Sequence, residues 1–200
     1  MTTAISPTAP ITTSTASDAE HAIAVLTLAF SMDPPNRWAW PDPQRYLASF
    51  PDFVRALGGR AFEQGSAYSL RDYAGVALWL PPGVPPDEEA LVALIQRTIS
   101  EPTQADMFAV IEQMGSYHPA EPHWYLPFIG VDPAHRGRGY GSALLHHALA
   151  VCDRDGLPAY LESTSPASAS LYERHGFEVL ATIQVGASPP IFPMLRRPRG

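Results

Sequence analysis

A glycine-rich segment between a strand-like run and a helix-like run limits what this chain can fold into. Residues 124–131 read WYLPFIGV and predict a buried strand, and residues 140–155 carry apolar side chains at helical spacing. Between them, residues 132–142 read DPAHRGRGYGS. The first N–H groups of a helix have no intrahelical partner, and with the macrodipole they attract anions. The segment therefore predicts a diphosphate cradle, whereas its plainer interpretation is a glycine-rich turn with two solvated arginines.

Two common phosphate-binding motifs do not fit this segment. A P-loop needs Gly-Lys followed by Ser or Thr, but all thirteen basic residues of this chain are Arg. A dinucleotide-binding fingerprint places its third Gly three residues after the second, whereas Gly141 follows Gly139 by two. Too few strands follow to build a nucleotide-binding sheet. A coenzyme A loop, written Arg/Gln-x-x-Gly-x-Gly/Ala, fits residues 136–141 at every fixed position.

This loop and a second motif together resemble the GNAT superfamily of acetyl-CoA-dependent N-acetyltransferases. The second motif is LYERHGF at residues 171–177, and in the family such a segment follows the strand after the CoA helix. The resemblance covers most of residues 9–196 and is strongest to the puromycin N-acetyltransferase group, for example in EPHWYL at residues 121–126. It implies an α/β (α+β) GNAT fold. In that fold a central mixed, mostly antiparallel sheet splays between two parallel strands and is flanked by helices.

The resemblance implies acetyl transfer to an amine, with acetyl-CoA as cosubstrate and no metal. The strand before the loop would offer backbone groups to the pantetheine arm and an N–H to the oxyanion of the tetrahedral intermediate. Family members often carry Asn seven residues before their catalytic Tyr, where this chain has Ser165, and Ser168 is an alternative contact. The residues expected to hold the cosubstrate are Ile129, Gly130, Val131, Arg136, Gly137, Arg138, Gly139, Tyr140, Gly141, Ser142, Ser165 and Ser168.

Tyr172 and Glu162 are the expected catalytic residues. Tyr172 matches the family's general acid, since a phenol with a pKa of about 10 stays protonated at neutral pH and can donate to a leaving thiolate. Glu162, late in its strand, is a candidate base or amine anchor, with a solvated strand-end charge as the alternative. His123 and His118 are weaker base candidates, and the histidines show no zinc-site spacing.

Aromatic side chains and one carboxylate are expected to select the acceptor. Phe30, Asp33 and Trp38 cluster between the first two helices, and Trp124 begins the strand before the loop. Such walls suit a flat or apolar amine, although core packing explains each residue equally well. The expected acceptor is a small-molecule primary amine, such as an aminonucleoside or another amine antibiotic. The alternatives are a protein or peptide N-acetyltransferase and a non-catalytic acyl-CoA-binding module.

Composition limits the partners and the location of the chain. A net charge of −7 makes nucleic acid and anionic membranes poor partners, and no apolar run reaches the ~18 residues of a membrane span. A single cysteine, Cys152, and an N-terminus without a secretory pattern favour a cytoplasmic location. We expect residues 1–8 to be a disordered tail and residues 9–200 a single domain, and the sequence leaves a homodimer open.

The remaining patterns predict the other helices and strands. Ser17 has N-cap spacing for a first helix that ends near residues 33–35, and Pro127 predicts a bulge or splay in its strand. Further helices are expected after residue 43, from residues 85–89 onward, and over residues 104–114 and 167–174. The expected strands are 11–13, 67–70, 75–80, 124–131, 159–163, 177–180 and 183–185.

Overall fold

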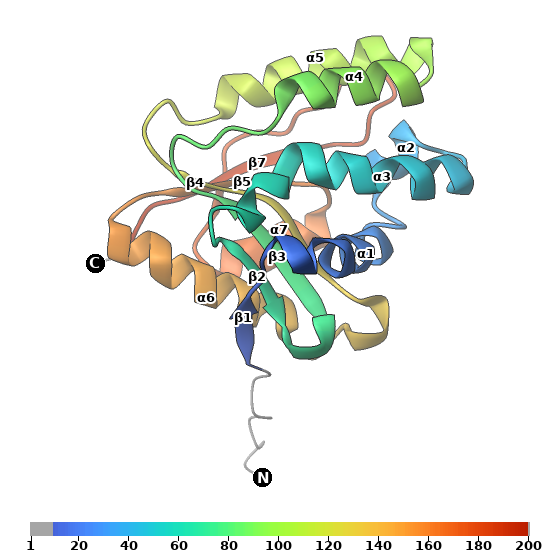
Figure 1. Cartoon of the computed structure of the whole chain (residues 1–200). Coiled ribbons are helices and arrows are strands. Elements are labelled where there is room, and N and C mark those ends of the chain that lie inside the picture. Colours follow the sequence, from blue (N-terminus) through green and yellow to red (C-terminus); the bar gives the residue numbers. More distant parts are fainter. Residues whose placement is uncertain (1–9, 200) are drawn as a thin grey trace.

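The computed structural model describes residues 10–199, and the expected tail over residues 1–8 lies outside them. One seven-stranded sheet runs through the molecule in the order β1-β2-β3-β4-β5-β7-β6 (Figure 1). Neighbouring strands are antiparallel except β4 and β5, which are parallel, so the expected mixed, mostly antiparallel sheet is confirmed. The strands are β1 (Ile11–Thr13), β2 (Ala67–Leu70), β3 (Gly75–Leu80), β4 (Trp124–Val131), β5 (Ala159–Ser163), β6 (Glu178–Val179) and β7 (Phe192–Arg196).

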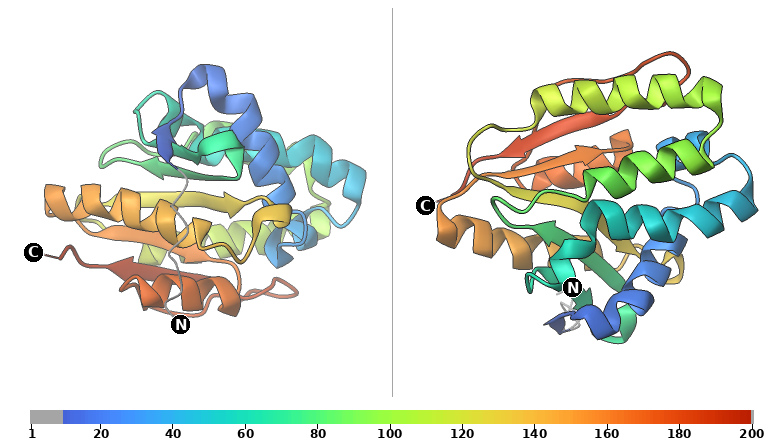
Figure 2. Two further views of the ribbon diagram at one scale, coloured as in Figure 1. Left: turned by 90° about the horizontal axis from the view of Figure 1, so that it is seen from below. Right: turned by 45° about the horizontal axis from the view of Figure 1, so that its top comes forward.

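Helices cover both faces of the sheet. The helices are α1 (Ala19–Ala29), α2 (Pro34–Ala39), α3 (Pro43–Gly58), α4 (Glu88–Thr98), α5 (Glu101–Tyr117), α6 (Tyr140–Asp155) and α7 (Pro166–Arg174). Figure 1 shows α4 and α5 side by side as an outer layer beyond α3, with α6 on the other side of the strands. Figure 2 shows the same arrangement of sheet and helices from below and with its top turned toward the viewer. None of the described helices has the length and apolar character needed to cross a membrane.

Alternation along β3 explains why its side chains enter two different hydrophobic cores. Val76, Leu78 and Leu80 point to the first core, which α1, α3 and α4 cover. Ala77 and Trp79, on the opposite face, belong to the second core, which α6 and α7 cover. Successive side chains of a strand point to opposite faces, so a wholly apolar strand is buried between two helical layers. The expected buried side of α6, ending in Cys152, lies in the second core.

The strand β4 is bulged and separates from β5. Leu78 of β3 pairs with Phe128 and Leu80 pairs with Tyr125, so β4 carries one extra residue in this interval, which contains Pro127. The predicted irregularity is therefore confirmed. In the described chain, β5 pairs with β4 only at Trp124 and Tyr125. Beyond Tyr125, the backbone of β4 on the β5 side is left without a strand partner and can contact a ligand.

Four local expectations were wrong or incomplete. Thr15 and Asp18, rather than Ser17, form the capping box before α1, with the Thr15 N–H donating to Asp18 Oδ2 over 2.8 Å. The first helix ends at Ala29 rather than near residues 33–35, where the short helix α2 begins instead, and the strand β7 was not predicted. Residues 183–185 contribute one isolated bridge, between Ile183 and Ile191, instead of a strand.

Candidate active site

A cleft of about 1550 Å³ passes along the separated end of β4. Its lining combines parts of the chain that are far apart in sequence. The loop before α6 contributes Arg136, the strand β5 contributes Glu162, and α7 contributes Tyr172. Apolar side chains of α4 and α5 complete the wall. The cleft thus joins the predicted cosubstrate loop to the predicted catalytic residues.

The N-terminus of α6 fits the expected diphosphate. Gly139 is the N-cap residue with a φ of 78°, and no side chain caps the helix. Gly137 also has a positive φ, 76°, a conformation that L side chains rarely adopt. The first N–H groups of this 16-residue helix are consequently left for an anion. Gly141, in the first turn, lines the cleft itself.

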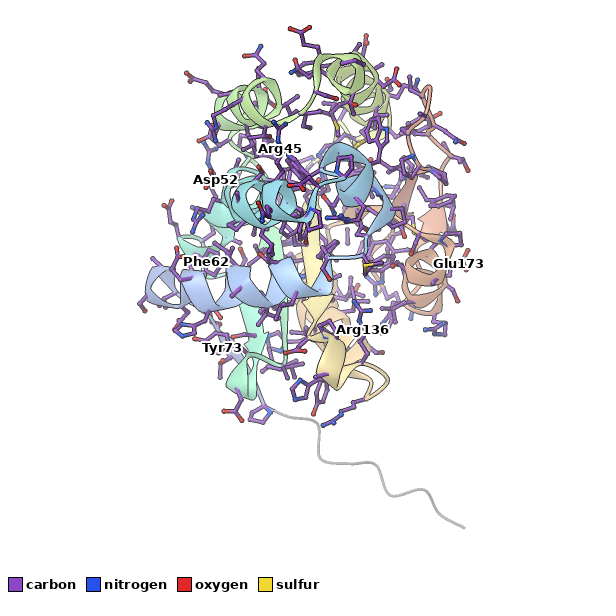
Figure 3. All side chains as sticks on the ribbon, turned by 90° about the vertical axis from the view of Figure 1, so that its right-hand side faces the viewer. Arg45, Asp52, Phe62, Tyr73, Arg136 and Glu173 are labelled. Carbon is purple, nitrogen blue, oxygen red and sulfur yellow. The ribbon has the colours of Figure 1, made fainter. Side chains whose placement is uncertain are left out.

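The two arginines of the loop have different environments. The Arg136 guanidinium donates from Nη2 to the carbonyl oxygen of Ala29 over 2.7 Å, at the end of α1. Figure 3 shows Arg136 where β4 ends, with α1 beside it and Glu173 on α7 farther out. This bond satisfies an orphan carbonyl of α1 and fixes the guanidinium at the cleft. Arg138 is exposed.

Three other residues of the predicted cosubstrate set use their side-chain positions for packing. The Ser142 hydroxyl lies 2.7 Å from Nε2 of His175, which ties α6 to the end of α7. Tyr140 packs against the second core. A Cβ at Gly130 would lie 2.7 Å from Cβ of Ala29, so α1 requires glycine at this position. These residues can therefore contact a ligand through the backbone rather than through side chains.

The Tyr172 phenol is buried and lines the cleft. Burial, and secondly the negative charge of Asp33, raise the pKa of Tyr172. Both effects disfavour the phenolate. The phenol therefore keeps its proton well above neutral pH, as a proton donor requires.

Two serines begin α7 beside Tyr172. Ser165 is the N-cap residue: its Oγ accepts from the Ser168 N–H over 3.2 Å and donates to Ser168 Oγ over 3.0 Å. Both residues line the cleft. Their contact with the cosubstrate stays a prediction of the sequence.

Glu162 is a nearly buried carboxylate in the cleft wall, and its side chain is 8% exposed. Tyr125 and Tyr160 lie beside it. Burial, and then the Glu162 charge, raise the pKa of both phenols, which stay neutral. Nδ1 of His118 lies 4.0 Å from Glu162 Oε1.

Asp33 is a second carboxylate of the cleft. Its Oδ1 accepts from the Asn36 N–H and from Asn36 Nδ2, over 3.3 Å and 2.7 Å, and its Oδ2 accepts from the Thr164 hydroxyl. Burial raises the pKa of Asp33, and these hydrogen bonds oppose the rise. Asp33 therefore fastens the start of α2 to the loop after β5. Phe30, nearby in sequence, lines the same cleft.

Two predicted acceptor contacts are not brought to the cleft. Trp124 packs against the second core, and its Nε1 donates to Asp155 Oδ2 over 3.2 Å. Trp38 is partly buried and does not line the cleft. Within residues 10–199, no group of three or more His, Cys, Asp or Glu side chains is arranged to hold a metal ion.

Sequence reasoning missed the apolar wall that α4 and α5 contribute. Its cleft-lining side chains include Leu91, Met107, Phe108, Ile111 and Met114. One signal was available, because α5 carries several large apolar residues but only Val110 of this helix is fully buried. Apolar side chains in excess of what the core buries can indicate a binding groove.

Comparison with protein families gives a match over most of the chain. A sequence model of the Acetyltransferase (GNAT) family matches residues 35–177. An uncharacterized N-acetyltransferase of Schizosaccharomyces pombe is 26% identical over 204 residues, which cover 92% of this chain and 81% of the yeast protein.

Solved structures have the same fold. One, from Corynebacterium glutamicum, is described as histone acetyltransferase HPA2 and related acetyltransferase; it is 28% identical, with a TM-score of 0.70, over 97% of this chain and 98% of its own. The polyamine N-acetyltransferase of Drosophila melanogaster is 16% identical, with a TM-score of 0.69, over 94% of this chain and 99% of its own. At that identity the likeness concerns the fold alone.

Proposed function

Because the chain belongs to the acetyltransferase (GNAT) family, we propose that it moves an acetyl group from acetyl-CoA to the primary amine of a small molecule. The chain is an acyl-CoA N-acyltransferase. The proposed acceptor has an apolar body, and an aminonucleoside or another amine antibiotic is the class that the sequence predicts. A cytoplasmic location and a homodimer remain predictions of the sequence.

One observation carries this proposal. A single cleft is lined by the start of α6, by Tyr172 and Glu162, and by the apolar side chains of α4 and α5. Acetyl transfer needs the donor and the amine in one site shielded from water. A volume of about 1550 Å³ is larger than a typical pocket for one small ligand, so it suits two.

Each group at the cleft has a proposed task. The N-terminus of α6 binds the diphosphate, and the unpaired edge of β4 holds the pantetheine arm next to it. Acetyl-CoA supplies an activated acetyl group and a thiolate leaving group. Tyr172 donates its phenolic proton to that thiolate, and Glu162 accepts a proton from the incoming ammonium. Asp33 and Phe30 contact the acceptor.

The alternative acceptors would need different side chains around the cleft. A polyamine, the acceptor named for the Drosophila relative, carries several cationic groups and needs several carboxylates spaced along it. Of the four acidic residues in the lining, Asp33 already accepts hydrogen bonds from the protein and Glu121 is paired with Arg197, which leaves Glu88 and Glu162 among many apolar side chains. A peptide acceptor needs an open groove, whereas α4 and α5 form part of the wall. These observations favour an apolar amine.

A thiol-release assay tests the proposal. The purified chain would be mixed with acetyl-CoA and with a panel of an aminonucleoside, arylalkylamines, agmatine, a polyamine and peptides with free N-termini. We expect the highest kcat/KM with amines that carry an apolar body. Faster turnover of polyamines or of peptides would overturn the proposed acceptor class. Binding of CoA without thiol release on any amine would instead favour the acyl-CoA-binding module.

A further inference from the structure

Two histidines form a hydrogen-bonded pair next to Glu162. His118 is the C-cap residue of α5, and His123 lies in the loop that leads to β4. Their Nε2 atoms are 2.9 Å apart, and Nδ1 of His123 is 2.7 Å from the carbonyl oxygen of Glu121. Nδ1 of His118 faces Oε1 of Glu162 over 4.0 Å. The two histidines, Glu121 and Glu162 all line the cleft.

The contacts fix where the hydrogens lie on the two rings. A carbonyl oxygen only accepts, so Nδ1 of His123 carries a hydrogen. In the neutral ring its Nε2 is then a bare acceptor, and Nε2 of His118 must donate to it. His118 is left with Nδ1 as its only variable position. That atom is the one that faces the Glu162 carboxylate.

The geometry points to His118 as the group that takes the acceptor's proton from Glu162 and releases it to solvent. This inference rests on the proposed function. Glu162 accepts one proton from the acceptor ammonium, which leaves a neutral amine and a carboxylic acid. The carboxylic acid passes that proton to Nδ1 of His118, which leaves a carboxylate and an imidazolium. At 4.0 Å the two atoms are in ion-pair range, so the transfer requires a side-chain rotation that closes the gap.

The surroundings of His118 favour this role over a static ion pair. His118 is the C-cap residue of α5, and a helix C-terminus is a place where a positive charge is tolerated. The His118 side chain is 36% exposed and can return its proton to water, whereas Glu162 is 8% exposed and cannot do so readily. His123 is a positioning residue, because it holds Nε2 of His118 and thereby aims Nδ1 at Glu162.

The other titratable groups near His118 do not compete for the proton. Tyr125 and Tyr160 pack edge-on against the ring, with centroids 5.1 Å and 4.7 Å away, and their raised pKa keeps both phenols neutral. Burial lowers the pKa of His123, so this ring stays neutral as well. The Glu121 carboxylate is paired with Arg197.

Removal of the imidazole tests the inference in the active enzyme. We expect His118→Ala to lower kcat about 10-fold or more near pH 6.5, and the deficit to shrink as pH rises and hydroxide takes over. Added imidazole should restore part of the rate in a concentration-dependent way. His147→Ala, which removes an exposed histidine of α6, is the matched control and should keep the wild-type rate. A deficit that neither varies with pH nor responds to imidazole would overturn the inference.

The ring ¹⁵N signals of the histidines test the same inference without turnover. In the full-length protein, Glu162→Gln should move the Nδ1 signal of His118 and leave the ring signals of His147 unchanged, because of these two rings only His118 faces that carboxylate. An unmoved Nδ1 signal, or a hydrogen on Nδ1 of the neutral His118 ring, would overturn the inference, because that atom could then not take the proton. If His118 responds as expected but no amine is acetylated, the proposed function fails while the pairing of His118 with Glu162 stands.

Discussion

Tyr172 is the residue through which the proposed chemistry is most directly tested, because its phenol is buried at the cleft and keeps its proton. We expect Tyr172→Phe to lower kcat roughly 100-fold or more, the range of a general acid, while the affinity for CoA stays the same. Steady-state kinetics and a CoA titration measure the two quantities.

Tyr68→Phe is the matched control for that variant. Tyr68, like Tyr172, is a buried tyrosine of the second core, but it does not line the cleft. Its variant should retain full turnover. Equal rates for Tyr172→Phe and the wild type would remove the phenol from the reaction.

A variant of Gly141 tests whether the cosubstrate binds at the start of α6. A Cβ there would lie 3.5 Å from Leu171 Cδ2, an ordinary contact, so Gly141→Ala should fold normally. Its methyl group would stand at the first turn of α6, next to the expected diphosphate. We expect KM for acetyl-CoA to rise about 10-fold, because the methyl group would cost about one contact between the helix backbone and the diphosphate.

Gly59→Ala serves as the comparison for Gly141→Ala. Gly59 is the C-cap of α3, has an αR conformation, and would place a Cβ 3.8 Å from Cβ of Arg55. It lies outside the cleft lining. A similar change of KM in both variants, or none in either, would count against a diphosphate at Gly141.

At the scale of elements, α6 and β7 are joined by a charged pair. Arg196, whose side chain is 4% exposed, donates from both Nη atoms to the Asp153 carboxylate over 2.7 Å and 2.8 Å. Arg196, and less strongly the Arg199 N–H, hold the pKa of Asp153 below its usual range. A lowered pKa contributes stability above the unfolded value of about 3.9, and this stability is lost as pH falls through the folded value.

Asp153→Asn should therefore lower the free energy of unfolding by about 3 kcal/mol at pH 7, because Arg196 stays buried without its counter-charge. The difference from wild type should narrow below about pH 4. Urea unfolding at several pH values measures it. Asp52→Asn, at an exposed surface pair, should cost less than about 1 kcal/mol. A difference that does not depend on pH would contradict the assigned role of Asp153.

The elements that sequence reasoning found are those with long apolar periodicity. The strands β3 and β4 and the helix α6 were predicted within a residue or two, because each buries a regular set of side chains. The strand β7 was missed because it contains Pro193 and a buried arginine, whose partner Asp153 is 43 residues away. The helix α2 has six residues, too few for a period, and its two prolines read as an end of α1.

For the molecule as a whole, the cleft lies where β4 separates from β5, and helices from distant parts of the chain form its walls. That the loop, Tyr172 and Glu162 reach one cleft could be expected, because two motifs carry the loop and Tyr172 and the strand between them carries Glu162. Their roles stay predictions. The wall from α4 and α5 could not be expected, because nothing local in the sequence indicates which side of a helix faces a cavity. Thr164 and His118 likewise gain their positions only from contacts with residues distant in the chain.

A variant of Phe108 tests whether the acceptor amine binds against α5. Phe108 lies on α5, lines the cleft and packs against the first core. We expect Phe108→Ala to lower kcat/KM for an apolar amine about 10-fold, and to leave KM for acetyl-CoA unchanged. Gln113→Ala, at an exposed position of the same helix, should change neither constant. An acceptor site elsewhere would be indicated if both variants behaved alike.

A calorimetric titration of the purified chain with acetyl-CoA tests the central claim most directly, since everything proposed for the cleft requires that the cosubstrate binds at the start of α6. The account predicts saturable binding with one site per chain, weakened in Gly141→Ala and retained in Tyr172→Phe. Absence of binding to the wild-type chain, or equal affinity in all three proteins, would contradict it.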